Sequence, residues 1–248
     1  MKKNPEILYD DGDIIAVNKP AGFMVYPDGF NGGPYLTDWI IEKYPETKKV
    51  GETERLRSGE EIARPGIVHR LDKNTSGVLL IARTEKAYNH LKLLFKNREV
   101  EKTYHAFVYG VVKKDKGRID RPIGKSAKNF RLWSAQRGAR GKLREAVTDY
   151  RVLWRGEDGS FLQVSPLTGR THQIRVHMKA INHSIVCDPL YAPKRESLFG
   201  FERVALHASN IMFKNQAGED AFIRAPFPID FRKAFDTIGI NTISFNEV

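Results

Sequence analysis

The sequence predicts an α+β fold, because strand-like and helix-like segments both occur and do not alternate regularly. Strands are indicated by apolar–polar alternation or short apolar runs, and helices by apolar residues spaced three or four apart. A regular alternation of strands and helices would instead indicate a doubly wound parallel sheet. The 248 residues contain no clear linker, so we expect residues 1–248 to form a single domain.

In the first half of the chain, Thr84 is suited to begin a helix, because its hydroxyl can accept a hydrogen bond from an amide of the first helical turn. The residues that follow carry an apolar stripe at helical spacing. Residues 46–65 are polar and weakly patterned, so we expect a mobile loop there. The other elements expected in this half are strands at residues 6–9, 13–19 and 78–82 and a helix at residues 36–44.

In the second half, residues 117–144 are rich in glycine and cations and show little periodicity, which indicates an extended basic excursion between strands. Residues 171–181 place Ile174, Met178 and Ile181 on one helical face. A short helix is expected at residues 229–238. The strands expected in this half are residues 102–112, 147–154, 161–165 and 205–213.

The composition narrows the class of protein. No run of about 18 apolar residues occurs, so we expect no membrane span. Acidic residues soon after the Met1-Lys2-Lys3 start interrupt any signal-peptide core. The single cysteine, Cys187, excludes an internal disulfide and a cysteine-based zinc site. We expect a cytoplasmic protein that acts as a monomer.

The net charge of +11 is unevenly distributed along the chain. Residues 113–151 hold thirteen Lys or Arg against four Asp or Glu, and Phe130, Trp133 and Tyr150 lie among them. Cations interleaved with aromatic rings suit a phosphate backbone and its bases. An anionic membrane surface is the main rival partner, but no basic amphipathic helix supports it. We therefore expect this segment to bind nucleic acid.

The most informative stretch is His69-Arg70-Leu71-Asp72-Lys73-Asn74-Thr75-Ser76-Gly77. It places a carboxylate, cations and a turn directly before the apolar run 78–82. Loops held at the edge of a sheet commonly carry catalytic groups. On the residues alone, Asp72 has two interpretations: it caps the turn through the local backbone, or it acts in chemistry. The turn residues Thr75 and Ser76 can cap local amides, and Gly77 permits a positive φ.

Four segments together carry a resemblance to a known family: residues 18–22 (NKPAG), 69–77 (HRLDKNTSG), 102–106 (KTYHA) and 167–177 (LTGRTHQIRVH). In order, spacing and residue type they resemble the RluA-type RNA pseudouridine synthases, over about residues 6–230. The resemblance implies the pseudouridine synthase fold, with a mixed, largely antiparallel central sheet flanked by helices and loops. Many relatives carry a small RNA-binding module ahead of the catalytic domain. Here the pattern starts within ten residues of Met1, so we expect no such module.

The resemblance implies an isomerase that detaches uracil from ribose and rejoins it through carbon 5, a reaction that requires no cofactor. It assigns the nucleophile to Asp72, its basic partner to Arg175 and the active-site aromatic residue to Tyr104. Arg suits its role because a planar guanidinium can pair bidentately with a carboxylate. The tyrosine can stack on the uracil and assist a proton transfer. Whether Asp72 attacks the base or the sugar is left open.

The target uridine must leave its stack to reach the nucleophile, and Arg70 and His69 are placed to fill the vacated space. Lys19 and Arg170 are further candidate RNA contacts within the matching motifs. In the basic segment the candidates are Lys125, Lys128, Arg131 and Arg140. We expect the partner to be structured ribosomal or transfer RNA, because unpaired or distorted regions expose base edges that an A-form duplex hides.

Two other functions remain open from the sequence. The chain could be a non-catalytic RNA-binding or ribosome-assembly protein that retains the fold, or a strand-cleaving enzyme that uses histidines as acid and base. The joint presence of Asp72, Tyr104 and Arg175 favours the isomerase. His172 and His177 are five residues apart, which puts them on one face of neither a helix nor a strand, so we expect no metal site.

Overall fold

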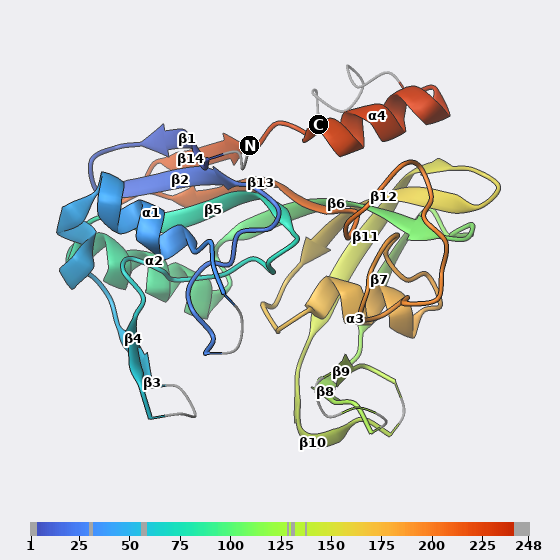
Figure 1. Cartoon of the computed structure of the whole chain (residues 1–248), viewed down its shortest axis with the longest axis horizontal. Helices are drawn as coiled ribbons and strands as arrows, with labels where there is room; N and C mark the ends of the chain where they lie inside the picture. Colours follow the sequence, from blue (N-terminus) through green and yellow to red (C-terminus); the bar gives the residue numbers. More distant parts are fainter. Residues whose placement is uncertain are drawn as a thin grey trace. The chain divides into compact units, whose positions relative to one another are not determined.

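The structure is a computed structural model, and it describes residues 4–29, 32–55, 59–127, 129, 132–136 and 138–240. The chain divides into two compact units (Figure 1). The N-terminal unit comprises Met1–Glu101 and Ala208–Pro226, and the C-terminal unit comprises Lys102–His207 and Phe227–Val248. Each unit takes up two separate stretches of chain. That residues 1–248 act as a single domain stays a prediction.

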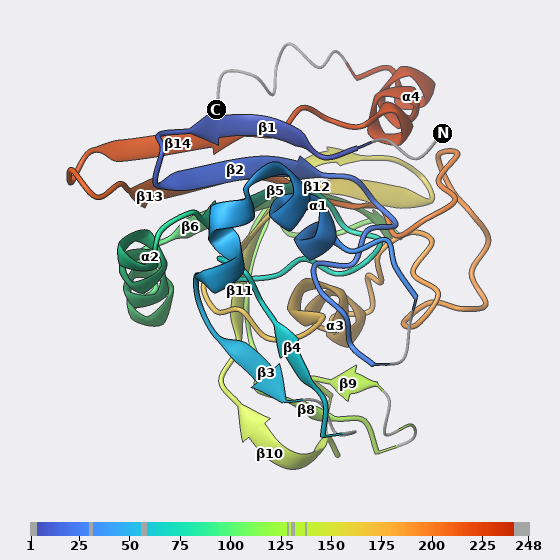
Figure 2. The same ribbon diagram turned by 60° about the vertical axis from the view of Figure 1, so that its left-hand side comes forward.

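The N-terminal unit is built on a sheet in which residues 6–10 pair with 14–19, 14–19 with 76–82 and 206–214 with 220–224, each pair antiparallel. Its central strand, β5 (Ser76–Ala82), is buried along its whole length, as is typical of a continuous apolar run covered on both faces. Helices α1 (Leu36–Lys43) and α2 (Glu85–Asn97) lie on the same side of this sheet (Figures 1 and 2). The strand order is β1 (Glu6–Asp10), β2 (Ile14–Lys19), β5 (Ser76–Ala82) and β13 (Leu206–Lys214), with β14 (Asp220–Arg224) paired to β13.

One local prediction is confirmed in this unit and another is wrong. The hydroxyl of Thr84 accepts a hydrogen bond from the amide of Ala87 at 3.2 Å and caps α2. Residues 46–65 are not simply a loop, which corrects the prediction. They contain most of a 3-10 helix, Pro45–Lys49, and a small hairpin of β3 (Thr53–Arg55) and β4 (Glu61–Ala63). Strands of three residues are too short for alternation to be recognised.

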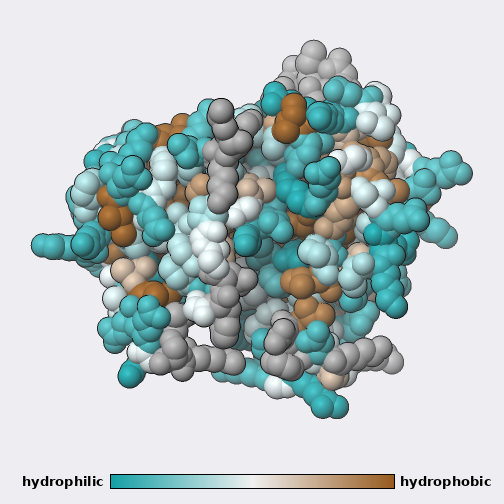
Figure 3. Space-filling model, viewed as in Figure 1, coloured by the Kyte–Doolittle hydropathy of each residue, from teal (hydrophilic) through white to brown (hydrophobic). Residues whose placement is uncertain are grey.

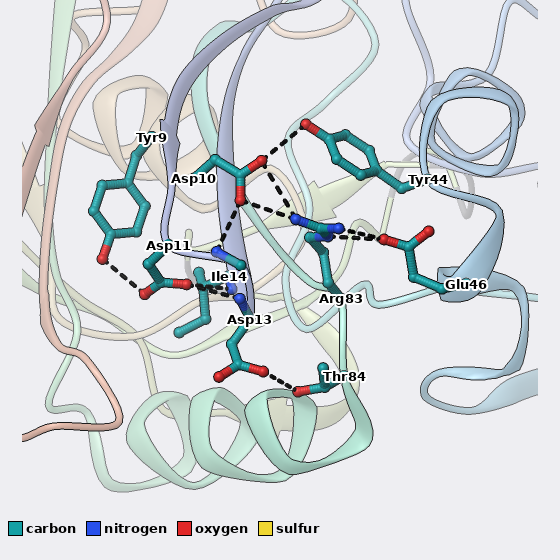
Figure 4. A network of polar contacts seen from close by, with 10 residues as sticks. Tyr9, Asp10, Asp11, Asp13, Ile14, Tyr44, Glu46, Arg83 and Thr84 are labelled. Atoms are coloured by element: carbon teal, nitrogen blue, oxygen red, sulfur yellow. Dashed lines mark hydrogen bonds and ion pairs between the residues drawn. The ribbon is translucent and has the colours of Figure 1, made fainter.

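A polar network fixes one end of the N-terminal sheet (Figure 4). The Arg83 guanidinium donates to Asp10 at 3.1 Å and to Glu46 at 2.6 Å. The hydrogen bond from Arg83 holds the pKa of Glu46 below its ordinary value. Burial raises the pKa of Tyr9, which donates to Asp11, to about 12. These contacts lie near Ile14, where β2 begins. The site described below lies near Lys19, where β2 ends.

The C-terminal unit is built on an antiparallel sheet in the order β6 (Glu101–Tyr109), β12 (Gly159–Pro166), β11 (Val147–Arg155) and β7 (Lys116–Asp120). Helices α3 (Gln173–Ala180) and α4 (Ile229–Ile238) cover opposite faces of it (Figure 1). An aromatic core lies under α4, where Phe161 packs on Phe107 with ring centroids 4.6 Å apart and on Phe235 at 5.1 Å.

A short three-stranded sheet extends from this unit (Figure 2). It consists of β8 (Ile123–Lys125), β9 (Trp133–Ser134) and β10 (Arg140–Arg144), in the order β10-β8-β9. We call residues 123–144 the basic finger. The predicted excursion is thus confirmed in part, but it starts later than expected, because residues 116–120 form β7 and pair with β11.

The two units confirm the predicted α+β class, with mostly antiparallel sheets and four helices among the described residues. Within those residues, no helix combines the length and the apolar character that crossing a membrane requires.

Candidate active site

Asp72 lies half-buried in the loop that precedes β5. The loop turns sharply, because the amide of Thr75 donates to the carbonyl of Asp72 at 3.1 Å. The next carbonyl, that of Lys73, accepts hydrogen bonds from the amide of Gly22 at 2.8 Å and from the ammonium of Lys19 at 3.2 Å. Lys19, the last residue of β2, and Gly22, shortly after it, therefore both hold the carbonyl of the residue that follows Asp72.

Lys19 is the most unusual residue of this region. Its side chain is fully buried, and its ammonium also donates to the carbonyls of Pro20 and Phe23, both at 2.9 Å. A buried ammonium is tolerated only when polar partners replace its hydration shell. The cation is thus turned inward and fastens the loop that carries Asp72, and a contact of Lys19 with RNA stays a prediction.

Gly77 is required by close packing at the start of β5. Its φ is +116°, and a Cβ atom there would lie 2.0 Å from the carbonyl oxygen of Ala208 on β13. The expected positive φ is thus confirmed. The expected cap by Thr75 is not found, because its hydroxyl is buried without a hydrogen bond within the described residues.

His69 and Arg70 differ in how they are held. The Nε2 atom of His69 accepts a hydrogen bond from the amide of Leu80 at 2.8 Å, and its ring stacks on Phe95 at 4.6 Å. These contacts commit His69 to supporting the loop. Arg70 is exposed and donates to the hydroxyl of Tyr26 at 3.0 Å, with its guanidinium 5.1 Å from the centre of that ring. Of the two predicted wedges, the geometry favours Arg70.

Tyr104 and Arg175 belong to the C-terminal unit and lie on the same face of its sheet. Tyr104 on β6 pairs with Val164, which pairs with Tyr150, and directly paired residues share a face. Thr148, two residues before Tyr150, hydrogen-bonds through its hydroxyl to His177 of α3 at 2.9 Å. Because side chains two apart in a strand point the same way, Tyr104 lies on the face that α3 covers.

The helix that carries Arg175 is fixed by buried polar contacts. Gln173 is buried, its amide nitrogen donates to the Val147 carbonyl and the Thr148 hydroxyl at 3.0 Å each, and its amide oxygen accepts from Thr168 at 2.7 Å. Burial lowers the pKa of His177 and favours its neutral ring. These contacts hold the first turns of α3 against β11.

Arg175 is itself buried, at 6% exposure. Its Nε and Nη2 atoms donate to the two carboxylate oxygens of Asp188, at 2.7 and 2.8 Å. The guanidinium also lies 5.1 Å from the ring centre of Tyr191. The predicted pairing of Arg175 with Asp72 concerns residues of different units and stays a prediction.

Sequence reasoning did not single out Asp188, Tyr191 or Gln173. A signal for Asp188 was present: an acidic residue directly before Pro189, and soon after the apolar pair Ile185-Val186, suggests a loop at the end of a buried segment. For Gln173, no local sequence pattern indicates that the oxygen and the nitrogen of its side-chain amide both make hydrogen bonds inside the protein.

The remaining predicted RNA contacts lie in or beside the basic finger. Lys125 on β8 lies 4.0 Å from the ring centre of Trp133, and its strand partner Arg140 is exposed. Arg170 donates to the carbonyl of Glu145 at 3.0 Å and so supports the chain where it returns to β11. Lys128 and Arg131 lie outside the described residues.

The surface agrees with a polar partner for the finger. All five residues of β10 are exposed, three of them cations. Hydrophilic residues occupy parts of the lower edge of Figure 3, the edge at which β8, β9 and β10 lie in Figure 1. Among the described residues, no group of three or more His, Cys, Asp or Glu is arranged to hold a metal ion.

Comparison with known proteins gives a consistent result. Residues 13–180 match the model of the family described as RNA pseudouridylate synthase. The chain is 35% identical over 237 residues to the uncharacterized RNA pseudouridine synthase YlyB of Bacillus subtilis (strain 168), covering 95% of this chain and 73% of that protein. It is 33% identical to the ribosomal large subunit pseudouridine synthase D of Zymomonas mobilis, with the same two shares covered.

Among solved structures, human RNA pseudouridylate synthase domain containing 1 is similar, with a TM-score of 0.67 and 26% identity, covering 91% of this chain and 84% of that chain. A second human protein, RNA pseudouridylate synthase domain containing 4, shares the fold with a TM-score of 0.72 and 22% identity, covering 95% of this chain and 93% of that chain. The chain therefore belongs to the RluA-type family of RNA pseudouridine synthases and is an isomerase.

Proposed function

We propose that this enzyme isomerises specific uridines in ribosomal or transfer RNA, with the Asp72 carboxylate as the nucleophile. The observation that carries the proposal is the fastening of the Asp72 loop by Lys19 and Gly22, which presents a half-buried carboxylate at the end of a rigid strand. A relative that is named for the large ribosomal subunit supports ribosomal RNA as the substrate.

The reaction requires that the bond between N1 of uracil and C1′ of ribose breaks and that a bond between C5 and C1′ forms. The hydrogen on C5 then leaves as a proton and N1 takes up a proton, so atoms balance without any co-reactant. A carboxylate can form a transient covalent bond to either the base or the sugar and release it afterwards. In this proposal the fixed charge of Arg175 favours the ionised form of Asp72.

Tyr104 supplies the aromatic surface on which the uracil stacks while it is detached. Removing the uridine from its stack costs a few kcal/mol, and Arg70, oriented by Tyr26, enters the space left behind. Lys125 and Arg140 of the basic finger bind phosphates. In this proposal the enzyme works in the cytoplasm as a monomer, without a cofactor or metal, with residues 1–248 as one catalytic domain.

The test is a map of pseudouridine in cellular RNA from three strains: one with the gene, one without it, and one with Asp72→Asn. We expect at least one site that is present with the parent gene and absent from the other two strains. Full modification with Asp72→Asn would refute the role of Asp72. Modified RNA strands should stay intact, because the reaction cleaves no phosphodiester, and cleavage at the target would instead indicate a nuclease.

A further inference from the structure

We propose that Asp188 and Tyr191 are positioning residues that hold Arg175 and connect it to the basic finger. Both lie on the loop that follows Ile185 and Val186, and both contact Arg175 directly. The inference rests on the proposed function, because it concerns how Arg175 is held for its role beside Asp72.

The contact with Asp188 fixes the position of the Arg175 guanidinium and the orientation of its plane. Two parallel hydrogen bonds, from Nε and Nη2, end on the two oxygens of one carboxylate that is only 1% exposed. Bidentate pairs of this kind fix orientation as well as distance. Arginine has a long side chain with many rotamers, so without this partner its position would not follow from the helix alone.

Asp188 is in turn fixed by its own loop. Its Oδ1 atom accepts hydrogen bonds from the backbone amides of Leu190 at 2.9 Å and Tyr191 at 3.1 Å. These bonds leave the carboxylate little freedom to rotate. The loop, rather than the Arg175 side chain, therefore sets where the guanidinium lies.

Tyr191 contacts three structures at once. Its buried ring lies beside the guanidinium of Arg175, at 5.1 Å. Its hydroxyl makes a hydrogen bond with Nδ1 of His172 at 2.9 Å, and His172 is the residue before α3, with a φ of +56°. The same hydroxyl accepts a hydrogen bond from the amide of Trp133 at 3.3 Å.

The Trp133 contact joins this assembly to the RNA-binding surface. Trp133 lies on β9 of the basic finger, and its ring holds the ammonium of Lys125 at 4.0 Å. A phosphate bound by Lys125 thus acts on a strand whose backbone is tied to Tyr191, and Tyr191 packs on Arg175. The backbone of the finger and the guanidinium of Arg175 are thereby linked through one side chain.

The experiment measures kcat and the RNA dissociation constant separately for Asp188→Asn, with Asp230→Asn as the matched control. Asp230 forms a comparable bidentate pair with Arg203 in the same unit, at 2.6 and 3.1 Å, away from the proposed chemistry. For Asp188→Asn we expect kcat to fall about 10- to 100-fold, because misplacing a catalytic group by about 1 Å has this effect, with an unchanged dissociation constant. Equal falls in kcat for both variants, or none for Asp188→Asn, would overturn the proposal.

Tyr191→Phe provides a second variant that removes a single oxygen and retains the ring. We expect kcat to fall about threefold to tenfold, in keeping with the loss of one or two hydrogen bonds, again at an unchanged dissociation constant. If Asp188→Asn lacks a cooperative unfolding transition, Tyr191→Phe decides: an unchanged kcat overturns the proposal. Asp72→Asn is measured in parallel, because its activity would refute the proposed function, whereas an inactive Asp72→Asn beside a fully active Asp188→Asn refutes only this inference.

Discussion

Replacing Lys19 by methionine is the sharpest test of how the Asp72 loop is held. Methionine retains most of the buried volume but removes the ammonium that donates to the carbonyls of Pro20, Phe23 and Lys73. Each carbonyl loses a charge-assisted partner, and the carbonyl of Phe23 loses it in a buried place. We expect a less stable protein in which the loop is less firmly held.

The magnitude follows from two opposing contributions. A hydrogen bond to a charged group contributes about 1.5–3 kcal/mol, so three contribute about 4.5–9 kcal/mol. Removing the charge also removes its desolvation penalty, which amounts to several kcal/mol for a buried ion. The net loss in the free energy of unfolding should therefore be about 2–4 kcal/mol. With a urea dependence of about 3 kcal/mol per molar, the unfolding midpoint falls by about 1 M.

The assay is urea unfolding followed by intrinsic fluorescence, with Lys73→Met as the control. The side chain of Lys73 is exposed, and only its backbone carbonyl takes part in the contacts described. Each variant removes one positive charge, so a difference between their unfolding midpoints cannot come from net charge. Equal midpoints for Lys19→Met and Lys73→Met would refute the reasoning.

Three other predictions follow from single features. Gly77→Ala should lower the free energy of unfolding by about 3 kcal/mol or more, since its Cβ would lie 2.0 Å from the Ala208 carbonyl oxygen at a φ of +116°; an unfolding midpoint like the parent's would contradict this. Burial lowers the pKa of Lys102 from 10.5 to about 8. Between pH 8 and 10.5 the unfolded state therefore binds more protons, and the free energy of unfolding should rise with pH. Lys102→Met should show a smaller rise, and a rise equal to the parent's would contradict the role of Lys102. Replacing Lys125 and Arg140 by alanine should reduce the slope of log K for RNA against log salt by about 1.5; an unchanged slope would exclude them as phosphate contacts.

Elements defined by local patterns could be predicted from the sequence. The C-terminal helix occupies the expected residues 229–238, and Thr84 caps the helix it was expected to begin. In both, the information lies within a few neighbouring residues. The hairpin at β3 and β4 could not be predicted in this way, because strands of three residues show no usable period.

The site was predictable in its motifs but not in its contacts. A lysine is ordinarily expected at the surface, yet the ammonium of Lys19 donates a hydrogen bond to a carbonyl 54 residues away in the sequence. Asp188 carries no motif of its own, and only folding brings it to Arg175. Contacts between residues distant in sequence depend on packing that periodicity does not encode. The resemblance singled out the segments, and the structure adds the contacts by which Lys19 and His69 support the loop.

The most direct test of the central claim is tritium release from RNA that carries tritium on C5 of uridine. Forming the C5–C1′ bond displaces that hydrogen into water, so release reports the isomerisation itself. We predict steady release with the parent protein and none above background with Asp72→Asn, while both proteins bind the RNA equally. Release by Asp72→Asn at the parent rate would contradict the assignment of Asp72 as the nucleophile.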